Sequence, residues 1–111
     1  MSSRSEYDAA YFTLLRAREE HAQLLSYREY LVNERERLDD FVAELRDRAE
    51  HLPRRMRRAV DQTTKAVVEA IGTRRSVVLA ELERMDDRIS NAQHFVEECE
   101  TEVEELRDSG A

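Results

Sequence analysis

The densest group of chemically active side chains in this sequence is a run of arginines near its middle. Residues 46–58 hold six Arg against two acidic residues, a local charge of +4, and the arginines are Arg46, Arg48, Arg54, Arg55, Arg57 and Arg58. The planar guanidinium fork suits phosphate and carboxylate groups. No aromatic residue interrupts the run, so bases are not expected to stack there. Nucleic-acid binding would therefore be phosphate-driven, salt-sensitive and weakly sequence-specific.

The ordinary alternative for this run is a solvated turn whose charges are paired within the chain. Asp47, Glu50 and Asp61 lie three or four residues from several of the arginines, the spacing at which opposite charges meet on a helix. Both interpretations stay open from the sequence.

Motifs for catalysis are incomplete. No Glu-x-x-His pair of the kind that binds two irons in helical bundles occurs. The nearest match to the carboxylate pattern of helical nucleotide pyrophosphohydrolases is Glu19-Glu20-x-x-Gln23 followed by Glu36-x-x-Asp39, and its third carboxylate is missing. The three histidines are scattered, and no phosphate-binding glycine loop is present. We therefore expect a protein that is not an enzyme and that binds neither a metal nor a cofactor.

A second charged region is acidic. Residues 81–111 hold eleven acidic residues against three basic ones, a local charge of −8 within a net charge of −7. We expect its glutamates to form a solvated face, and they could also pair with the basic tip of a neighbouring molecule or with a basic partner. The acidic remainder of the chain argues against general coating of nucleic acid or adhesion to an anionic membrane.

Composition indicates the compartment. The single cysteine, Cys99, excludes a disulfide within the chain and suits a reducing cytoplasm. The first residues lack the apolar core of a signal peptide, and the longest apolar runs, such as 77–80, are far too short to span a membrane. We expect a soluble, cytoplasmic protein with no membrane partner.

Two apolar seams must position these groups. The first, from Tyr7 to Leu52, follows a heptad whose d positions are all apolar: Ala10, Ala17, Leu24, Leu31, Leu38, Leu45 and Leu52. The second runs from Thr64 to Leu106 with eleven of thirteen positions apolar. A repeat of 3.5 residues indicates helices wound on helices. With charged residues at 39%, aromatics at 6% and two glycines, the 111 residues are typical of one all-α domain, 1–111, rather than of a sheet.

Pro53 and Gly72 mark the two places where a helix could end. Proline inside a helix costs about 3 kcal/mol, so a turn at 51–53 between helices of about 4–50 and 53–108 is favoured over one continuous rod. The result is a long antiparallel hairpin, a coiled coil. At 72–73 the Gly-Thr pair is compatible with two structures. One is a continuous but kinked helix, which the unbroken seam favours, and the other is a break that creates a third helix.

The apolar stripe is wider than a hairpin needs. It includes, beside the seams, Tyr11, Leu15, Leu25, Val32, Val77 and Phe95. Stripes of this width usually cover a second layer. We therefore predict that two hairpins form a homodimeric four-helix bundle.

Arginines also interrupt the seams. Folding the chain about Pro53 places Arg35 opposite Gly72 and brings Arg28 and Arg75 into the same layer, with acids nearby at Glu29, Glu34, Glu36 and Glu69. One interpretation is a polar layer that fixes the helix register. The other is an anion or nucleotide site, since arginine forks bind phosphate.

Three functional hypotheses follow. The first is a protein–protein interaction module, a regulatory adaptor or an anti-factor in transcription. The alternative is a nucleic-acid-binding protein that contacts phosphates through the basic run. The third is a sensor of a small anionic ligand at the central arginines.

Overall fold

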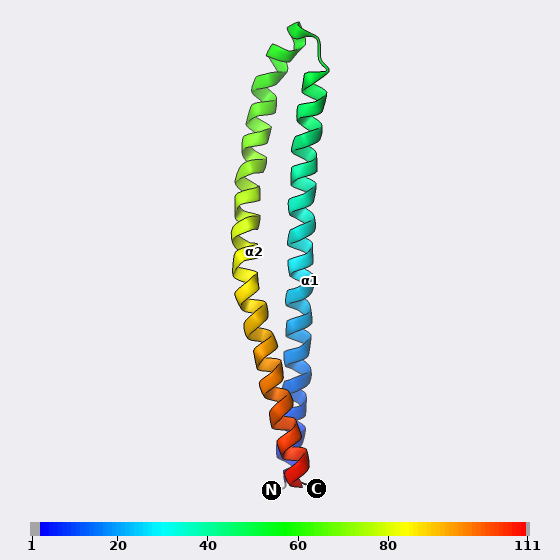
Figure 1. The fold of residues 1–111 in the computed structure, drawn as a ribbon, viewed down its shortest axis with the longest axis vertical. Coiled ribbons are helices and arrows are strands. Elements are labelled where there is room, and N and C mark those ends of the chain that lie inside the picture. The colour runs from blue at the N-terminus through cyan, green and yellow to red at the C-terminus, as the bar shows by residue number, and fades with distance from the viewer. Residues whose placement is uncertain (1–2, 111) are drawn as a thin grey trace. The chain divides into compact units, whose positions relative to one another are not determined.

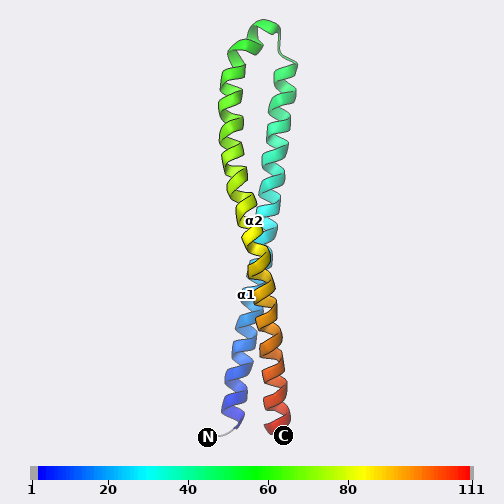
Figure 2. The same cartoon turned by 60° about the vertical axis from the view of Figure 1, so that its left-hand side comes forward.

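The computed structural model describes residues 3–110 and consists of two long helices joined by a short turn. Helix α1 spans Ser3–Glu50 and helix α2 spans Arg54–Gly110, and no strand occurs among the described residues. The two helices run antiparallel (Figures 1 and 2). The predicted all-α antiparallel hairpin is therefore confirmed, whereas residues 1, 2 and 111 of the predicted domain lie outside the described part of the chain.

The chain packs as two compact units, each combining a stretch of α1 with a stretch of α2. Among the described residues, the end unit comprises 3–28 and 84–110. The tip unit comprises residues 29–83 and contains the turn. Each unit has its own pattern of burial.

The end unit holds a closed apolar core. Six of its buried residues form one cluster, to which α1 contributes Ala10, Leu14 and Ala17 and α2 contributes Val96, Cys99 and Val103; Tyr7 and Leu106 pack against it. Met85 is also buried, outside this cluster. Burial, with the nearby charges of Glu102 and Glu98, raises the pKa of the Cys99 thiol. A buried thiol of this kind packs like a small apolar side chain and is a poor nucleophile.

The tip unit is less completely packed. Its buried residues are Leu31, Val78 and Leu82, and none of residues 36–77 is buried. Apolar seam side chains in that stretch, such as Val42 and Val68, are only half-buried. Two helices alone therefore leave part of this seam in contact with water.

The predicted seam coincides with the observed interior. All thirteen positions predicted for the second seam are buried or half-buried, and on the first seam Arg28 is the one exposed position. Its side chain is 47% exposed. The arginine therefore leaves the seam because its charge is better solvated outside.

The turn uses Pro53 as a helix cap. Its carbonyl accepts hydrogen bonds from the backbone N–H groups of Met56 and Arg57, both at 2.9 Å. A residue whose carbonyl accepts the first helical bond is the cap, not the first helical residue. Helix α2 therefore begins at Arg54, one residue later than the sequence predicts.

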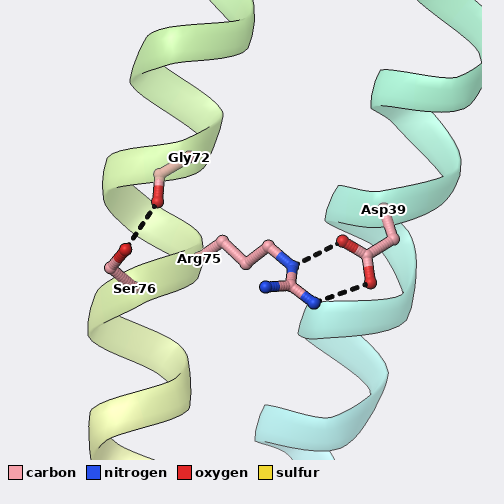
Figure 3. Close-up of polar contacts among 4 residues, drawn as sticks. All are labelled: Asp39, Gly72, Arg75 and Ser76. Atoms are coloured by element: carbon pink, nitrogen blue, oxygen red, sulfur yellow. Dashed lines mark hydrogen bonds and ion pairs between the residues drawn. The ribbon is translucent and has the colours of Figure 1, made fainter.

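Helix α2 is continuous through Gly72, so the alternative of a third helix is wrong. Among the described residues no glycine has a positive φ angle. The hydroxyl of Thr73 donates to the Glu69 carbonyl at 3.1 Å, and that of Ser76 donates to the Gly72 carbonyl at 3.1 Å (Figure 3). Both hydroxyls bond back to the preceding turn, which is how such residues behave inside a helix rather than at a cap.

Replacing Gly72 by alanine should stabilise the protein. A Cβ built at this position meets nothing within 4 Å. Alanine is favoured over glycine in a helix by about 1 kcal/mol, so G72A should raise the free energy of unfolding by about that amount. Urea denaturation followed by circular dichroism measures it, and A70G at the neighbouring exposed alanine should lower stability by a similar amount. Lower stability in G72A would show that α2 is not helical there.

Candidate functional site

Two basic side chains at the tip of the hairpin form hydrogen bonds to backbone carbonyls at the end of α1. Arg57 Nη2 donates to the backbone carbonyl of Glu50 at 2.7 Å. The ring Nδ1 of His51 lies 2.7 Å from the Asp47 carbonyl. The last carbonyls of a helix have no partner within the helix, and basic side chains commonly satisfy them. Arg57 and His51 therefore help to end α1.

The His51 ring titrates under the influence of this turn. Its pKa is raised from 6.5, first by the hydrogen bond to the Asp47 carbonyl, then by the carboxylate of Asp47 and, more weakly, that of Glu50. The carbonyl can only accept, so the bond requires a proton on Nδ1.

The other tip arginines are less constrained. Arg48 pairs with Glu44 at 2.6 Å. Within residues 3–110 the structure records no ion pair or hydrogen bond from the guanidinium groups of Arg46, Arg54, Arg55 and Arg58, all of which are exposed. Arg58 lies three residues before Asp61, but no pair between them is recorded among the described residues. The tip thus presents uncompensated positive charge.

The position of these arginines is not explained by helix stability. The first turn of α2 contains no acidic residue and begins with Arg54 and Arg55. The N-terminal end of a helix carries a partial positive charge, so basic residues there are mildly unfavourable. Together with Arg57, Arg58 and Asp61 they line a shallow concavity open to solvent. The cluster is thus a basic surface that does not stabilise the helix.

Two of the three arginines that interrupt the seams, Arg28 and Arg75, pair with carboxylates on the opposite helix. Arg75 binds Asp39 in a two-pronged contact, with Nε–Oδ1 at 2.6 Å and Nη2–Oδ2 at 3.4 Å (Figure 3). This contact raises the pKa of Arg75. Arg28 Nε lies 3.4 Å from Asp86 Oδ1. Arg35 is half-buried. None of the recorded partners of Arg28 and Arg75 is one of the acids predicted to lie near them.

A second two-pronged pair between the helices was not predicted from the sequence. Arg74 binds Glu34 through Nε–Oε1 at 2.7 Å and Nη2–Oε2 at 3.0 Å. The Glu34 side chain is only 16% exposed, and the hydrogen bond from Arg74 lowers its pKa. Arg74 lies beside the seam rather than on it, so the seam pattern gave no signal for it. With Arg28 and Arg75 neutralised by carboxylates, these positions offer an incoming anion little uncompensated charge.

Five of the six predicted stripe residues are exposed. Tyr11 and Leu15 are each 41% exposed, and the others are Leu25, Val77 and Phe95; Val32 is half-buried. Phe12, at 67%, is also exposed and was not predicted, because it lies outside the breadth assigned to the stripe. Its ring contacts Tyr11 edge-on, with ring centroids 6.4 Å apart. The end unit therefore carries an exposed aromatic and aliphatic face on α1.

Two further findings concern the described residues. Within 3–110 no helix is both long enough and apolar enough to cross a membrane. The same residues contain no group of three or more His, Cys, Asp or Glu side chains that could hold a metal ion.

No known protein family, curated protein or solved structure matches the chain. The charge clusters and the exposed apolar face are therefore the features from which a function can be argued.

Removing the His51 ring should change the pH dependence of stability. Because the folded pKa is raised, the contribution of the protonated ring is complete below pH 6.5 and is lost as the pH rises through the raised value. The melting temperature of H51A should therefore differ from that of the wild type more at low pH than at high pH. Titration by NMR should give a His51 pKa above 6.5.

The control for that experiment is D47N. It keeps the backbone carbonyl that is the largest cause of the shift, so most of the rise in the His51 pKa should remain. An unshifted His51 pKa in the wild type would contradict the observed turn.

Proposed function

We propose that this chain is a coiled-coil protein–protein interaction module, a regulatory adaptor or anti-factor that acts by binding another macromolecule rather than by catalysis. We place it in the cytoplasm and propose that it works as a homodimer. The observation that carries the proposal is the apolar face of the end unit, where Tyr11, Phe12, Leu15 and Leu25 are exposed on one helix.

The energetics of this face support an interaction role. Removing apolar surface from water contributes roughly 25 cal/mol per Å². Large aromatic and aliphatic side chains grouped within a polar surround are typical of interface centres. Beside Leu15 the surface is charged and polar, with Arg16, Glu19 and Glu20 lining a shallow hollow. The face thus combines an apolar centre with a polar rim.

A second candidate function is favoured by a specific observation at the tip. Arg54, Arg55 and Arg58 have no recorded acidic partner among the described residues, so they are available to phosphates. This candidate is a nucleic-acid-binding protein that contacts the backbone without reading bases.

The two candidates respond oppositely to two variants. For a protein partner other than a second copy of the chain, we expect Y11S/L25S to weaken binding by at least about tenfold, or about 1.4 kcal/mol, and R54E/R55E/R58E to change it little. The partner is first captured by cross-linking in the native cell and then purified, and its affinity for each variant is measured by calorimetry. F41S, at a phenylalanine that is 48% exposed but outside the stripe, is the control.

Titration of DNA and RNA completes the comparison. Salt-sensitive binding by the wild type at about 50 mM salt that R54E/R55E/R58E abolishes, while Y11S/L25S retains it, would contradict the adaptor function and establish the second candidate.

A further inference from the structure

We infer that the basic tip of one chain docks on the acidic end of a second copy, so that the homodimer is head-to-tail. This inference rests on the proposed function, because it names a second copy of the chain as one protein that the module binds. The tip is residues 46–58, and the acidic end is the stretch of α2 from 97 to 105.

The two regions carry opposite charges that their own chain leaves uncompensated. At the tip, Arg54, Arg55 and Arg58 have no recorded carboxylate partner among the described residues. The acidic end has six exposed glutamates: Glu97, Glu98, Glu100, Glu102, Glu104 and Glu105. Among these, an ion pair is recorded only for Glu98, with His94 at 3.2 Å. Each region is therefore a charged surface that an oppositely charged surface would complement.

These charges determine the orientation of a dimer. Two copies aligned tip to tip would set +4 against +4, and would set the acidic ends against each other. Like charges facing each other cost energy and suppress such arrangements. A head-to-tail pair with two-fold symmetry makes the tip-to-end contact twice. Electrostatic complementarity therefore favours the head-to-tail pair.

Apolar surface reinforces the same arrangement. In a head-to-tail pair the tip unit of one copy lies against the end unit of the other. The tip unit has the incompletely covered seam, with none of residues 36–77 buried. The end unit has Phe95, 47% exposed on α2 just before the acidic stretch. Each unit thus supplies apolar surface that the other lacks, as the two layers of a four-helix bundle require.

Sedimentation equilibrium of the full chain at several salt concentrations tests the inference. We expect the wild type to dimerise and its dissociation constant to rise between about 50 and about 500 mM NaCl, because salt screens attraction between the copies. R54E/R55E/R58E should weaken the dimer by at least about tenfold at the lower salt. This variant retains Arg57, which the turn uses to hold the Glu50 carbonyl.

A matched variant adds the same charge elsewhere. R4E/R16E/R18E changes three exposed arginines of the end unit, where the head-to-tail arrangement expects a basic neighbour. It should leave the dimer unchanged or tighten it. Because Arg16 pairs with Glu20 only on the surface of α1, little stability is lost.

A cross-link fixes the orientation directly. On a C99S background, D61C and E105C chains are mixed and oxidised. A D61C–E105C disulfide supports the head-to-tail pair, and a dominant D61C–D61C disulfide overturns it. A dimer that tightens with salt, or that is unaffected by R54E/R55E/R58E while that variant loses RNA binding, also overturns it.

The outcomes separate this inference from the proposed function. A wild type that is monomeric well above micromolar concentration overturns the head-to-tail dimer. The proposed function then still holds if Y11S/L25S loses a purified protein partner, and it fails if the variant does not.

Discussion

The packing of one apolar seam between α1 and α2 is the interaction on which the rest of this molecule depends. Side chains spaced at 3.5 residues face the opposite helix, and this spacing determines which groups are left outside. In the end unit the seam closes around Leu14, Val96 and Val103. In the tip unit it stays half open. A hairpin of two helices has no second layer, so apolar side chains beyond the seam, such as Tyr11 and Leu25, stay exposed.

Some charged side chains form ion pairs between the two helices, and others do not. Arg74 with Glu34, and Arg75 with Asp39, join the two helices of the tip unit. Since the folded pKa of Glu34 is lowered, its contribution is present above its usual pKa and is lost as the pH falls through the folded value. Among the described residues, no such link is recorded for Arg54, Arg55 and Arg58 or for the glutamates of 97–105. This contrast is why we assign them to binding.

The local sequence predicts that the two helices form, but it does not predict which side chains pair between them. Seam periodicity is a property of each helix alone, so the sequence identifies the positions that face the other helix. All of these positions are buried or half-buried except Arg28. Pairing across the hairpin depends on the turn and on where long side chains reach. Arg75 reaches across to Asp39 on the facing helix rather than to the acids expected near it, so folding the chain about Pro53 did not give the register of the two helices (Figure 3). Gly72 was ambiguous because Gly-Thr can either end a helix or continue one, and only the bonds back to the preceding turn decide.

The central claim is that a second copy covers the half-open seam of the tip unit. Amide hydrogen exchange, measured by mass spectrometry across a range of protein concentrations, tests it most directly. Residues 36–77 should exchange more slowly as the concentration rises, and R54E/R55E/R58E should need a higher concentration to reach the same protection. Exchange in this stretch that is independent of concentration would contradict the claim.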